Sequence, residues 1–184
     1  MAVRSAGIAL YRRMGGGIEI FLVHPGGPFW AAKDEGAWSI PKGLCAADED
    51  ALAAARREFA EETGVDVDGD FVELGAFRQP SGKIIQAWAL QGDCDPARLK
   101  SNLFAMEWPP RSGRQQEFPE VDRAGWFAPR DAVIRIVAGQ RPIIAALLGH
   151  LGLEQPDDLP RNGLKTPAPR RRAGAPRRYR RSSR

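Results

Sequence analysis

The chain has 184 residues, of which 43% are hydrophobic and 27% charged, and this composition is typical of a globular domain with a buried core. Its two cysteines and two histidines argue against a disulfide framework or a histidine-based zinc site. The apolar runs are too short to span a bilayer, and the first residues do not resemble a secretory signal, so we expect a cytoplasmic protein.

The net charge of +4 is unevenly distributed along the chain. Ten of the 27 Lys and Arg residues lie in residues 161–184, which contain no Asp or Glu. Residues 1–160 therefore carry 17 basic and 23 acidic side chains, a net charge of −6. After residue 153 the sequence is rich in Pro, Gly and Arg and lacks a core-forming pattern. We expect a folded domain over residues 1–153 and a disordered basic tail over 154–184.

The first half of the chain predicts a β-hairpin, a loop and a helix. Residues 4–13 and 17–24 have strand character and are joined by three glycines. A Gly/Pro-rich loop follows over 25–37. Residues 48–63 favour a helix, with Asp48 as its N-cap and Gly64 just past its end.

The second half predicts a hairpin, a further strand, a polar loop, a short strand and two closing helices. Their expected ranges are, in that order, 71–79 with 83–91, 101–108, 109–120, 124–128, and 129–139 with 141–151. Strands and helices mixed in this order favour an α/β fold with a mixed sheet.

Three glutamates crowd into five residues of the first predicted helix. At 100° per residue, Glu58, Glu61 and Glu62 lie within an arc of about 100°, next to the apolar stripe that contains Phe59. Unpaired carboxylates at the edge of a core are unfavourable. Arg57, four residues before Glu61, can hold one carboxylate, and a divalent cation can bind the others. The alternative is a glutamate-rich helix face that is simply solvated.

The wider spacing matches a known family. Gly43, then Glu49 after five residues, then the run 57–65 (REFAEETGV) after seven more, resembles the complete signature of the Nudix hydrolases. The resemblance covers roughly residues 1–150. It implies an α/β/α sandwich with a mixed sheet. It also implies Mg²⁺- or Mn²⁺-dependent hydrolysis of a nucleoside diphosphate linked to another moiety.

The resemblance also implies roles for particular residues. Two or three metal ions would be held by these groups: Glu58, Glu61, Glu62 and the carbonyl of Gly43. Arg57 would orient a glutamate and take part in catalysis. Glu49 is expected in the first helical turn, on the side of the helix away from the ligands, and has a structural role or an outer metal contact.

The segment before the signature narrows the substrate class. Trp38, followed after two residues by Pro41-Lys42-Gly43, resembles Nudix members that cleave dinucleoside polyphosphates. Lys42 would lie beside the phosphate chain, and Trp38 would contribute to substrate binding. The alternative for Lys42 is a solvated loop lysine.

The loop at 109–120 contains further candidates. Family members often place another glutamate in this region, as metal ligand or general base, and Glu120 fits best, with Glu117 next and Glu107 third. Either Glu58 or Glu120 would accept the proton from water. Arg111 and Arg114 are candidate phosphate ligands. Each of these residues has the alternative of an ordinary loop charge.

Two other functions remain open from the sequence. Pro80, fifteen residues after Val65, is similar to a feature of ADP-ribose-cleaving members, although Pro80-Ser81-Gly82 is also ordinary turn chemistry. A non-catalytic nucleotide- or RNA-binding module is the competing class. The Arg-rich tail would bind RNA or another polyanion through counterion release, or would serve as a solubilising extension.

Overall fold

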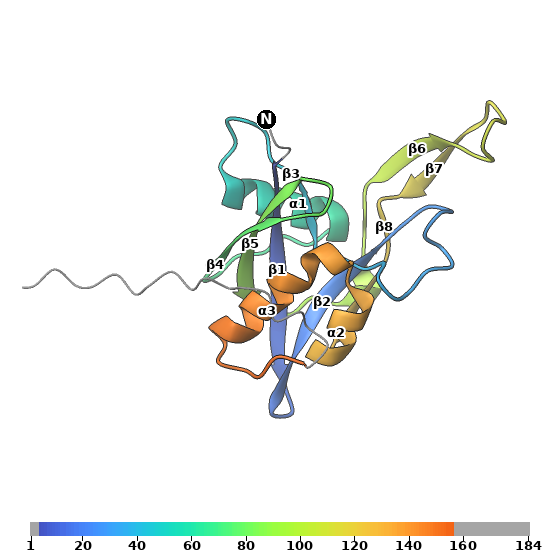
Figure 1. The fold of residues 1–184 in the computed structure, drawn as a ribbon. Coiled ribbons are helices and arrows are strands. Elements are labelled where there is room, and N and C mark those ends of the chain that lie inside the picture. The colour runs from blue at the N-terminus through green and yellow to red at the C-terminus, as the bar shows by residue number, and fades with distance from the viewer. Residues whose placement is uncertain (1–3, 157–184) are drawn as a thin grey trace, which may run out of the picture.

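The computed structural model describes residues 4–156 (Figure 1). The disordered basic tail is predicted over residues 154–184. Its residues from 157 onward lie outside the described part of the chain. The described elements are, in chain order, β1 (Arg4–Met14), β2 (Gly17–Pro25), β3 (Lys42–Leu44), α1 (Ala51–Thr63), β4 (Val72–Arg78), β5 (Ile84–Gln91), η1 (Pro96–Arg98), β6 (Leu103–Glu107), β7 (Gln115–Pro119), β8 (Val121–Phe127), α2 (Pro129–Arg135), η2 (Ala138–Gln140) and α3 (Arg141–His150). None of these helices is long and apolar enough to cross a membrane.

A mixed sheet forms the centre of the molecule. Its strands lie in the order β4-β5-β1-β2-β8, and β3 pairs with β1 beside this path. Strands β1 and β5 run parallel, and the other pairs are antiparallel. Both predicted hairpins, β1–β2 and β4–β5, are present. The first turns at Gly15 and Gly16, whose positive φ angles of 53° and 89° suit glycine.

Helices cover both faces of this sheet (Figure 1). On one face, Ala54, Ala55 and Phe59 of α1 pack against Ile8 and Leu10 of β1 in one buried cluster. A second buried cluster joins α2 and α3 to the opposite face. Alternate residues of β1 enter the two clusters because successive side chains of a strand point to opposite faces. The chain is therefore the α/β/α sandwich that the sequence predicts.

The segment before α1 is inserted where β1 and β2 separate. Residues 11–14 of β1 pair with β2, whereas residues 5–7 pair with β3. Between these two pairings, the Val23 N–H donates to the Ser39 carbonyl (2.9 Å) and the Ile8 N–H donates to the Pro41 carbonyl (3.0 Å). This insertion brings the loop that contains Lys42 into the sheet, facing α1.

Helix α1 begins later than predicted. Asp50, not Asp48, is its N-cap, and the Asp50 side chain accepts the Ala53 N–H at 2.9 Å. Glu49 therefore precedes the helix instead of lying in its first turn. The predicted end is confirmed, since Gly64 adopts a left-handed conformation with φ of 76°.

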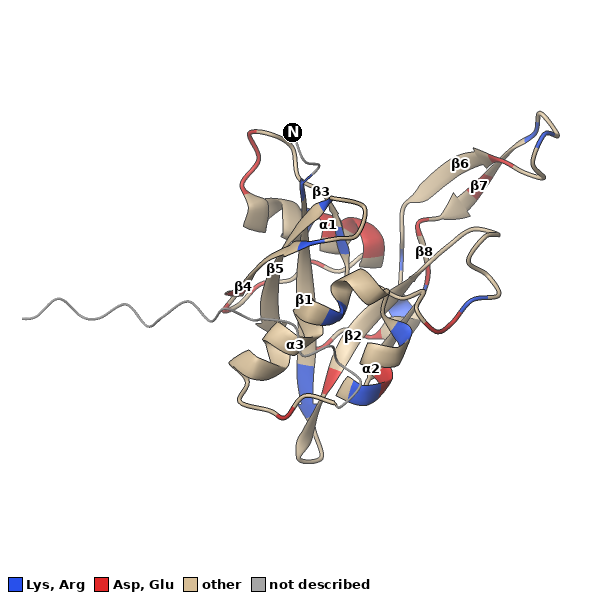
Figure 2. Ribbon diagram, viewed as in Figure 1, with Lys and Arg blue, Asp and Glu red and all other residues tan. Residues whose placement is uncertain are grey.

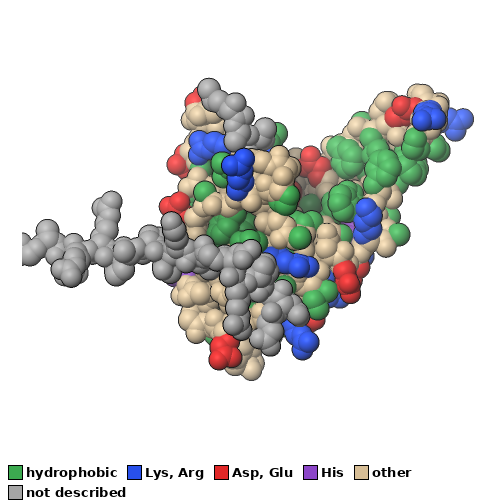
Figure 3. Space-filling view, viewed as in Figure 1, with side chains coloured by type: hydrophobic (Ala, Val, Ile, Leu, Met, Phe, Trp, Pro, Cys, Tyr) green, Lys and Arg blue, Asp and Glu red, His purple; other side chains and the backbone are tan. Residues whose placement is uncertain are grey.

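The predicted polar loop over 109–120 is wrong for its second half. Residues 115–119 form β7, which pairs antiparallel with β6 as a separate two-stranded sheet. This hairpin extends away from the central sheet (Figure 1), and apolar side chains gather along it (Figure 3). Leu103, for example, is 59% exposed. The sequence Gln115-Gln116-Glu117 lacks an apolar alternation because these residues are exposed, and that explains the missed strand.

Candidate active site

The last two turns of α1 hold the three glutamates at the edge of the sheet. Phe59 is fully buried and fixes the orientation of the helix. The Glu58 side chain is 14% exposed and the Glu61 side chain 39% exposed, so both lie at the border between core and solvent. In Figure 2 the ribbon at this end of α1 has the colour of acidic residues.

Strand β3 passes directly against these glutamates. A Cβ atom at Gly43 would overlap with the carboxylate of Glu58, so only glycine permits this close approach. The neighbouring Lys42 N–H donates to Glu62 Oε2 at 3.1 Å. The glycine that opens the family signature thus lets the backbone of β3 reach the carboxylates of α1.

Arg57 connects the glutamates to the loop before the helix. Its Nε and Nη2 donate to the two carboxylate oxygens of Glu49 at 2.9 and 3.0 Å, and Nη2 also donates to the Leu44 carbonyl at 2.9 Å. Its Nη1 donates to Glu58 Oε1 at 2.8 Å, whereas the contacts with Glu61 are longer, at 3.3–3.4 Å. The side-chain hydrogen bonds from Arg57 lower the pKa of Glu49. The sequence predicted that Arg57 would pair with Glu61, but the shorter hydrogen bonds of Arg57 go to Glu49 and Glu58.

The glutamates do not form a ready-made metal cage. Within residues 4–156, no three Asp, Glu, His or Cys side chains are grouped so that they could hold a metal ion as they stand. Arg57 engages Glu58 and Glu61, and the Lys42 N–H engages Glu62. The donors are nevertheless carboxylate oxygens, which Mg²⁺ and Mn²⁺ prefer. The donor chemistry, rather than a preformed geometry, fits a divalent cation.

Two carboxyl groups of the site resist ionisation. Burial raises the pKa of Glu62 to about 7, and repulsion from Glu58 and Glu120 adds to this effect, while Lys42 opposes it. Glu120 is an exposed residue, but local desolvation and repulsion from Glu58 and Glu61 also raise its pKa. Such a cluster of mutually repelling carboxylates favours the binding of a cation.

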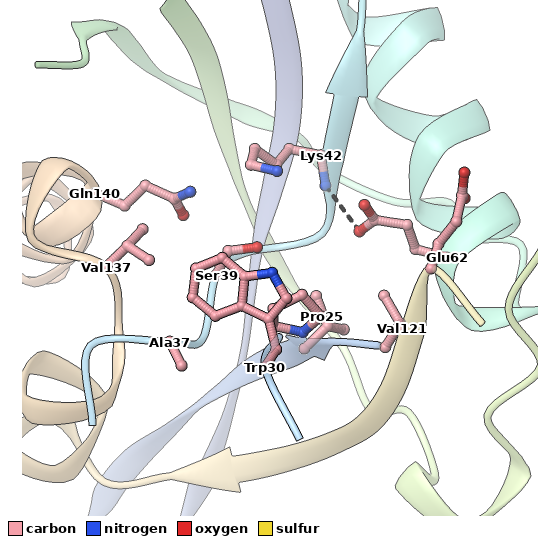
Figure 4. Close-up of a pocket in the computed structure, with 11 residues that line it drawn as sticks. Pro25, Trp30, Ala37, Ser39, Lys42, Glu62, Val121, Val137 and Gln140 are labelled. Carbon is pink, nitrogen blue, oxygen red and sulfur yellow. Dashed lines mark hydrogen bonds between the residues drawn. The ribbon is translucent and has the colours of Figure 1, made fainter. Parts of the chain in front are cut away.

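A cavity of about 320 Å³ opens beside these groups, and Lys42, Glu62 and Glu120 are among the residues that line it (Figure 4). The figure shows the backbone nitrogen of Lys42 directed at Glu62, while its side chain extends away, toward the side of the cavity where Gln140 lies. These three residues come from different elements: Glu62 from α1, Glu120 from the segment before β8, and Lys42 from β3. The fold therefore brings two of the predicted glutamates and the predicted lysine into one space.

Glu120 reaches this cavity because α1 holds the backbone of its segment. The Asn102 N–H donates to the Glu61 carbonyl at 3.1 Å, and the Glu120 N–H donates to the Asn102 carbonyl at 2.8 Å. The Glu120 carbonyl in turn accepts the Gly26 N–H at 3.0 Å. The other two glutamates considered for this role lie elsewhere: Glu117 is exposed on β7, and Glu107 accepts the Gly113 N–H at the hairpin turn.

Three residues expected to bind substrate do not line the cavity. Trp38 is 5% exposed, its indole N–H donates to Asp34 (2.8 Å), and its ring packs edge-on against Phe127. It is a core residue next to the cavity. Arg111 and Arg114 are exposed at the turn between β6 and β7, and Figure 2 shows this turn, with its basic residues, far from α1.

Two residues that the sequence did not single out do line the cavity. Trp30 belongs to the loop between β2 and β3, and Gln140 ends η2, so 110 positions separate them in the chain. No short motif connects them. An aromatic pair, Phe29-Trp30, within a Gly/Pro-rich loop was the one signal available for Trp30.

Comparison with known proteins agrees with this geometry. A family model described as the NUDIX domain matches residues 1–147 of the chain. The chain therefore belongs to the NUDIX family, and it is a Nudix-type hydrolase that acts on phosphoanhydrides. No curated protein matches it in sequence.

Solved structures show the same fold at low sequence identity. An Ap4A hydrolase of C. elegans in a binary complex is 22% identical, with a TM-score of 0.57, over 82% of this chain and 98% of that one. The NUDIX domain of NrtR from Shewanella oneidensis, complexed with ADP ribose, is 16% identical, with a TM-score of 0.58, over 82% and 89%. A mutT/nudix family protein from Listeria innocua is 18% identical, with a TM-score of 0.54, over 82% and 94%.

Proposed function

We propose that the chain hydrolyses a phosphoanhydride bond of a nucleoside polyphosphate in a reaction that depends on Mg²⁺ or Mn²⁺. The favoured substrates are dinucleoside polyphosphates and nucleoside triphosphates. The observation that carries this proposal is the convergence of Glu62, Glu120 and Lys42 on one cavity. Hydrolysis at phosphorus needs cation-binding carboxylates, a positive charge beside the phosphates and a proton acceptor within one space.

Four groups would hold two or three metal ions: the carboxylates of Glu58, Glu61 and Glu62 and the carbonyl of Gly43. When bound, such ions neutralise phosphate charge and lower the pKa of a water molecule. Arg57 keeps Glu58 oriented through its 2.8 Å hydrogen bond, and Glu49 holds Arg57 in turn. Glu49 therefore acts on the site through Arg57.

The remaining steps depend on the charges around the cavity. Glu120 accepts the proton of the attacking water, because its raised pKa makes it a better base than an ordinary carboxylate. Glu58 is the alternative acceptor, although Arg57 already occupies one of its oxygens. Lys42 donates hydrogen bonds to the phosphate chain. Arg111 and Arg114 have no part in this reaction.

The size of the cavity supports a single bound nucleotide. A volume of about 320 Å³ is at the lower end of the range for small-molecule sites. One nucleoside with its adjacent phosphates would occupy it, and the second half of a dinucleoside polyphosphate would extend outside. The Pro41-Lys42-Gly43 sequence favours the same class.

ADP-ribose is the second candidate substrate, since the NrtR domain binds it. The sequence argument for it rests on Pro80. Pro80 lies in the turn between β4 and β5, where the Gln79 N–H donates to the Lys83 carbonyl at 2.7 Å, and it does not line the cavity. We therefore favour polyphosphates over ADP-ribose.

The decisive variant is Glu62→Gln. It keeps the size of the side chain and an oxygen for the Lys42 N–H, but it removes the negative charge. We expect turnover to fall by orders of magnitude while thermal unfolding remains cooperative. Glu73→Gln, on the exposed surface of β4, is the matched control and should retain wild-type turnover. Near wild-type turnover of Glu62→Gln at saturating Mg²⁺ would refute the proposal.

A substrate screen separates the remaining alternatives. Dinucleoside polyphosphates, nucleoside triphosphates, ADP-ribose and 5′-triphosphate RNA would each be assayed with Mg²⁺ and with Mn²⁺. Preferred cleavage of ADP-ribose would replace the favoured substrate class. Salt-sensitive RNA binding without any turnover would instead support the non-catalytic module.

A further inference from the structure

We propose that the end of the cavity away from the glutamates is a purine subsite, in which Trp30 stacks on the base and the Gln140 amide nitrogen donates a hydrogen bond to the base edge. This inference rests on the proposed function in one respect: it takes the end lined by Glu62 as the metal and phosphate end, with the Lys42 side chain between that end and Gln140. It adds the residues that would distinguish a nucleotide from a bare phosphate compound.

Gln140 presents a donor to the cavity. The residue is 2% exposed and lines the cavity, and its Oε1 accepts the Ile40 N–H at 3.0 Å. Because a backbone N–H must meet the oxygen, this bond fixes which atom of the amide is the nitrogen. Within residues 4–156, Nε2 makes no hydrogen bond to the protein, and it is not one of the buried side-chain atoms that lack a partner. It is therefore an accessible donor, available to a ligand in the cavity that Gln140 lines.

Trp30 supplies an aromatic surface in the same space. Its side chain is partly buried against the α2/α3 core cluster, and Figure 4 shows the indole lying across the cavity beside Ser39. The Lys33 ammonium lies 4.5 Å from the centre of the indole ring, and the Lys33 N–H donates to the Trp30 carbonyl at 2.8 Å. The ring is therefore held in place before any ligand binds, which reduces the entropic cost of stacking.

Apolar side chains flank Gln140. Val137 and Ala37 line the cavity on this side, Glu62 lies on the far side, and the Lys42 side chain extends between them (Figure 4). These groups suit a flat heterocycle with a hydrogen-bond acceptor in its ring. Such a ring would stack on the indole of Trp30 and accept a hydrogen bond from Gln140. Among nucleobases, the two-ring purines overlap the two-ring indole most fully, so we assign the subsite to a purine nucleotide.

The test is equilibrium binding of AMP and of ribose 5-phosphate, measured by calorimetry with Mg²⁺ present. Neither probe contains a phosphoanhydride, so binding is measured without turnover. We expect AMP to bind about tenfold tighter or more than ribose 5-phosphate, since base stacking on an aromatic residue contributes an effect of this size. GMP should resemble AMP, and CMP and UMP should bind more weakly. Equal binding of AMP and ribose 5-phosphate, or a preference for pyrimidines, would overturn the assignment.

Two variants test the named residues. Gln140→Glu keeps an oxygen for the Ile40 N–H and replaces the donor with an acceptor, so AMP binding should weaken about tenfold. Trp30→Ala should remove most of the difference between AMP and ribose 5-phosphate. Binding of ribose 5-phosphate should change little in either variant. The matched control for Gln140→Glu is Gln116→Glu, on the exposed part of β7, which should bind AMP as the wild type does.

The unaltered protein provides an independent measurement, in case a variant is destabilised. The indole N–H resonance of Trp30, assigned with Trp30→Phe, should shift during an AMP titration observed by NMR, and that of Trp108 should not. An unshifted Trp30 resonance at saturating AMP would overturn the subsite.

The two proposals can fail separately. If nucleoside triphosphates are hydrolysed but AMP binding is unaffected by both variants, the subsite is wrong and the proposed function stands. If no substrate is hydrolysed but AMP binding depends on Trp30 and Gln140, the subsite stands and the proposed function is wrong.

Discussion

Glu62 couples the stability of the metal-free protein to pH. Its folded-state pKa is about 7, above the ordinary value of 4.5. The folded state therefore binds more protons than the unfolded state between these two pH values, and stability falls as pH rises through this window. We expect Glu62 alone to lower the free energy of unfolding by an amount on the order of 1–3 kcal/mol between pH 4.5 and pH 7.

Denaturant unfolding in the presence of a chelator, compared between wild type and Glu62→Gln across this pH range, measures that loss. The variant should be the more stable protein at pH 8, because it never has to bury a charge. Parallel stability curves for the two proteins would contradict the assigned pKa. Added Mg²⁺ should stabilise the wild type more at high pH than at low pH, since the cation competes with the proton.

Gly43 should be essential for activity and Gly149 should not. A methyl group at Gly43 would overlap the Glu58 carboxylate, so Gly43→Ala must displace either β3 or Glu58. Gly149→Ala, in α3, adds a methyl group in open space and at an ordinary backbone conformation. We expect hydrolysis to fall at least about tenfold in the first variant, by analogy with other small misplacements of catalytic groups. A steady-state assay of both variants checks this, and equal activities would show that the approach of β3 is not required.

At the scale of elements, the N-terminus of α1 offers a direct test of the observed helix boundary. The Asp50 carboxylate accepts the Ala53 N–H, while Asp48 is an exposed residue outside the helix. Asp50→Ala should therefore destabilise the protein by about 1 kcal/mol, and Asp48→Ala by much less. Chemical denaturation of the two variants distinguishes them. A larger destabilisation by Asp48→Ala than by Asp50→Ala would instead support the helix start that the sequence predicts, at Asp48.

These elements also indicate what could be predicted from sequence. The α1 boundary was missed because Asp48 and Asp50 are both good capping residues, and only the path of the preceding loop, tied by Glu49 to Arg57, decides between them. Gly64 was placed correctly because its constraint is local. The strand β7 was missed because its side chains are exposed and polar, so pairing with β6 rather than burial defines it.

The site residues differ in the same way: some are related by local spacing in the sequence, and others come together only in the folded chain. Glu58, Glu61 and Glu62 could be predicted to lie together because they fall within one helical turn and a half, where spacing determines their common face. Glu120 was proposed from the resemblance to family members, and the structure places it beside the same cavity as Glu62. Trp30 and Gln140 were not found, because their proximity results from how the β2–β3 loop and η2 meet over the sheet. Trp38 was misplaced because a motif reports which residue is present and not which way its ring faces.

At the scale of the whole molecule, both core clusters and the cavity lining described above are formed by residues within 4–156. A chain that ends at residue 156 should therefore fold and hydrolyse small nucleotides at close to the rate of the full chain. Calorimetric unfolding and a nucleotide assay of both chains check this. Complete loss of activity on truncation would place an essential part of the site in residues 157–184. If those residues bind RNA, only the full chain should show salt-sensitive RNA affinity.

The attachment of the β6–β7 hairpin has a mechanical consequence. At its base, the Asn102 N–H donates to the end of α1, and Glu120 bonds to Asn102 and Gly26. Nearer the tip, the ring of Trp108 packs edge-on against Phe29 of the β2–β3 loop, with 5.5 Å between the ring centres. Phe29 is followed by Trp30, which lines the cavity together with Glu120. The hairpin is therefore joined to two walls of the cavity, so a molecule that displaced its tip would act on the loop of Trp30 as well as on the segment of Glu120.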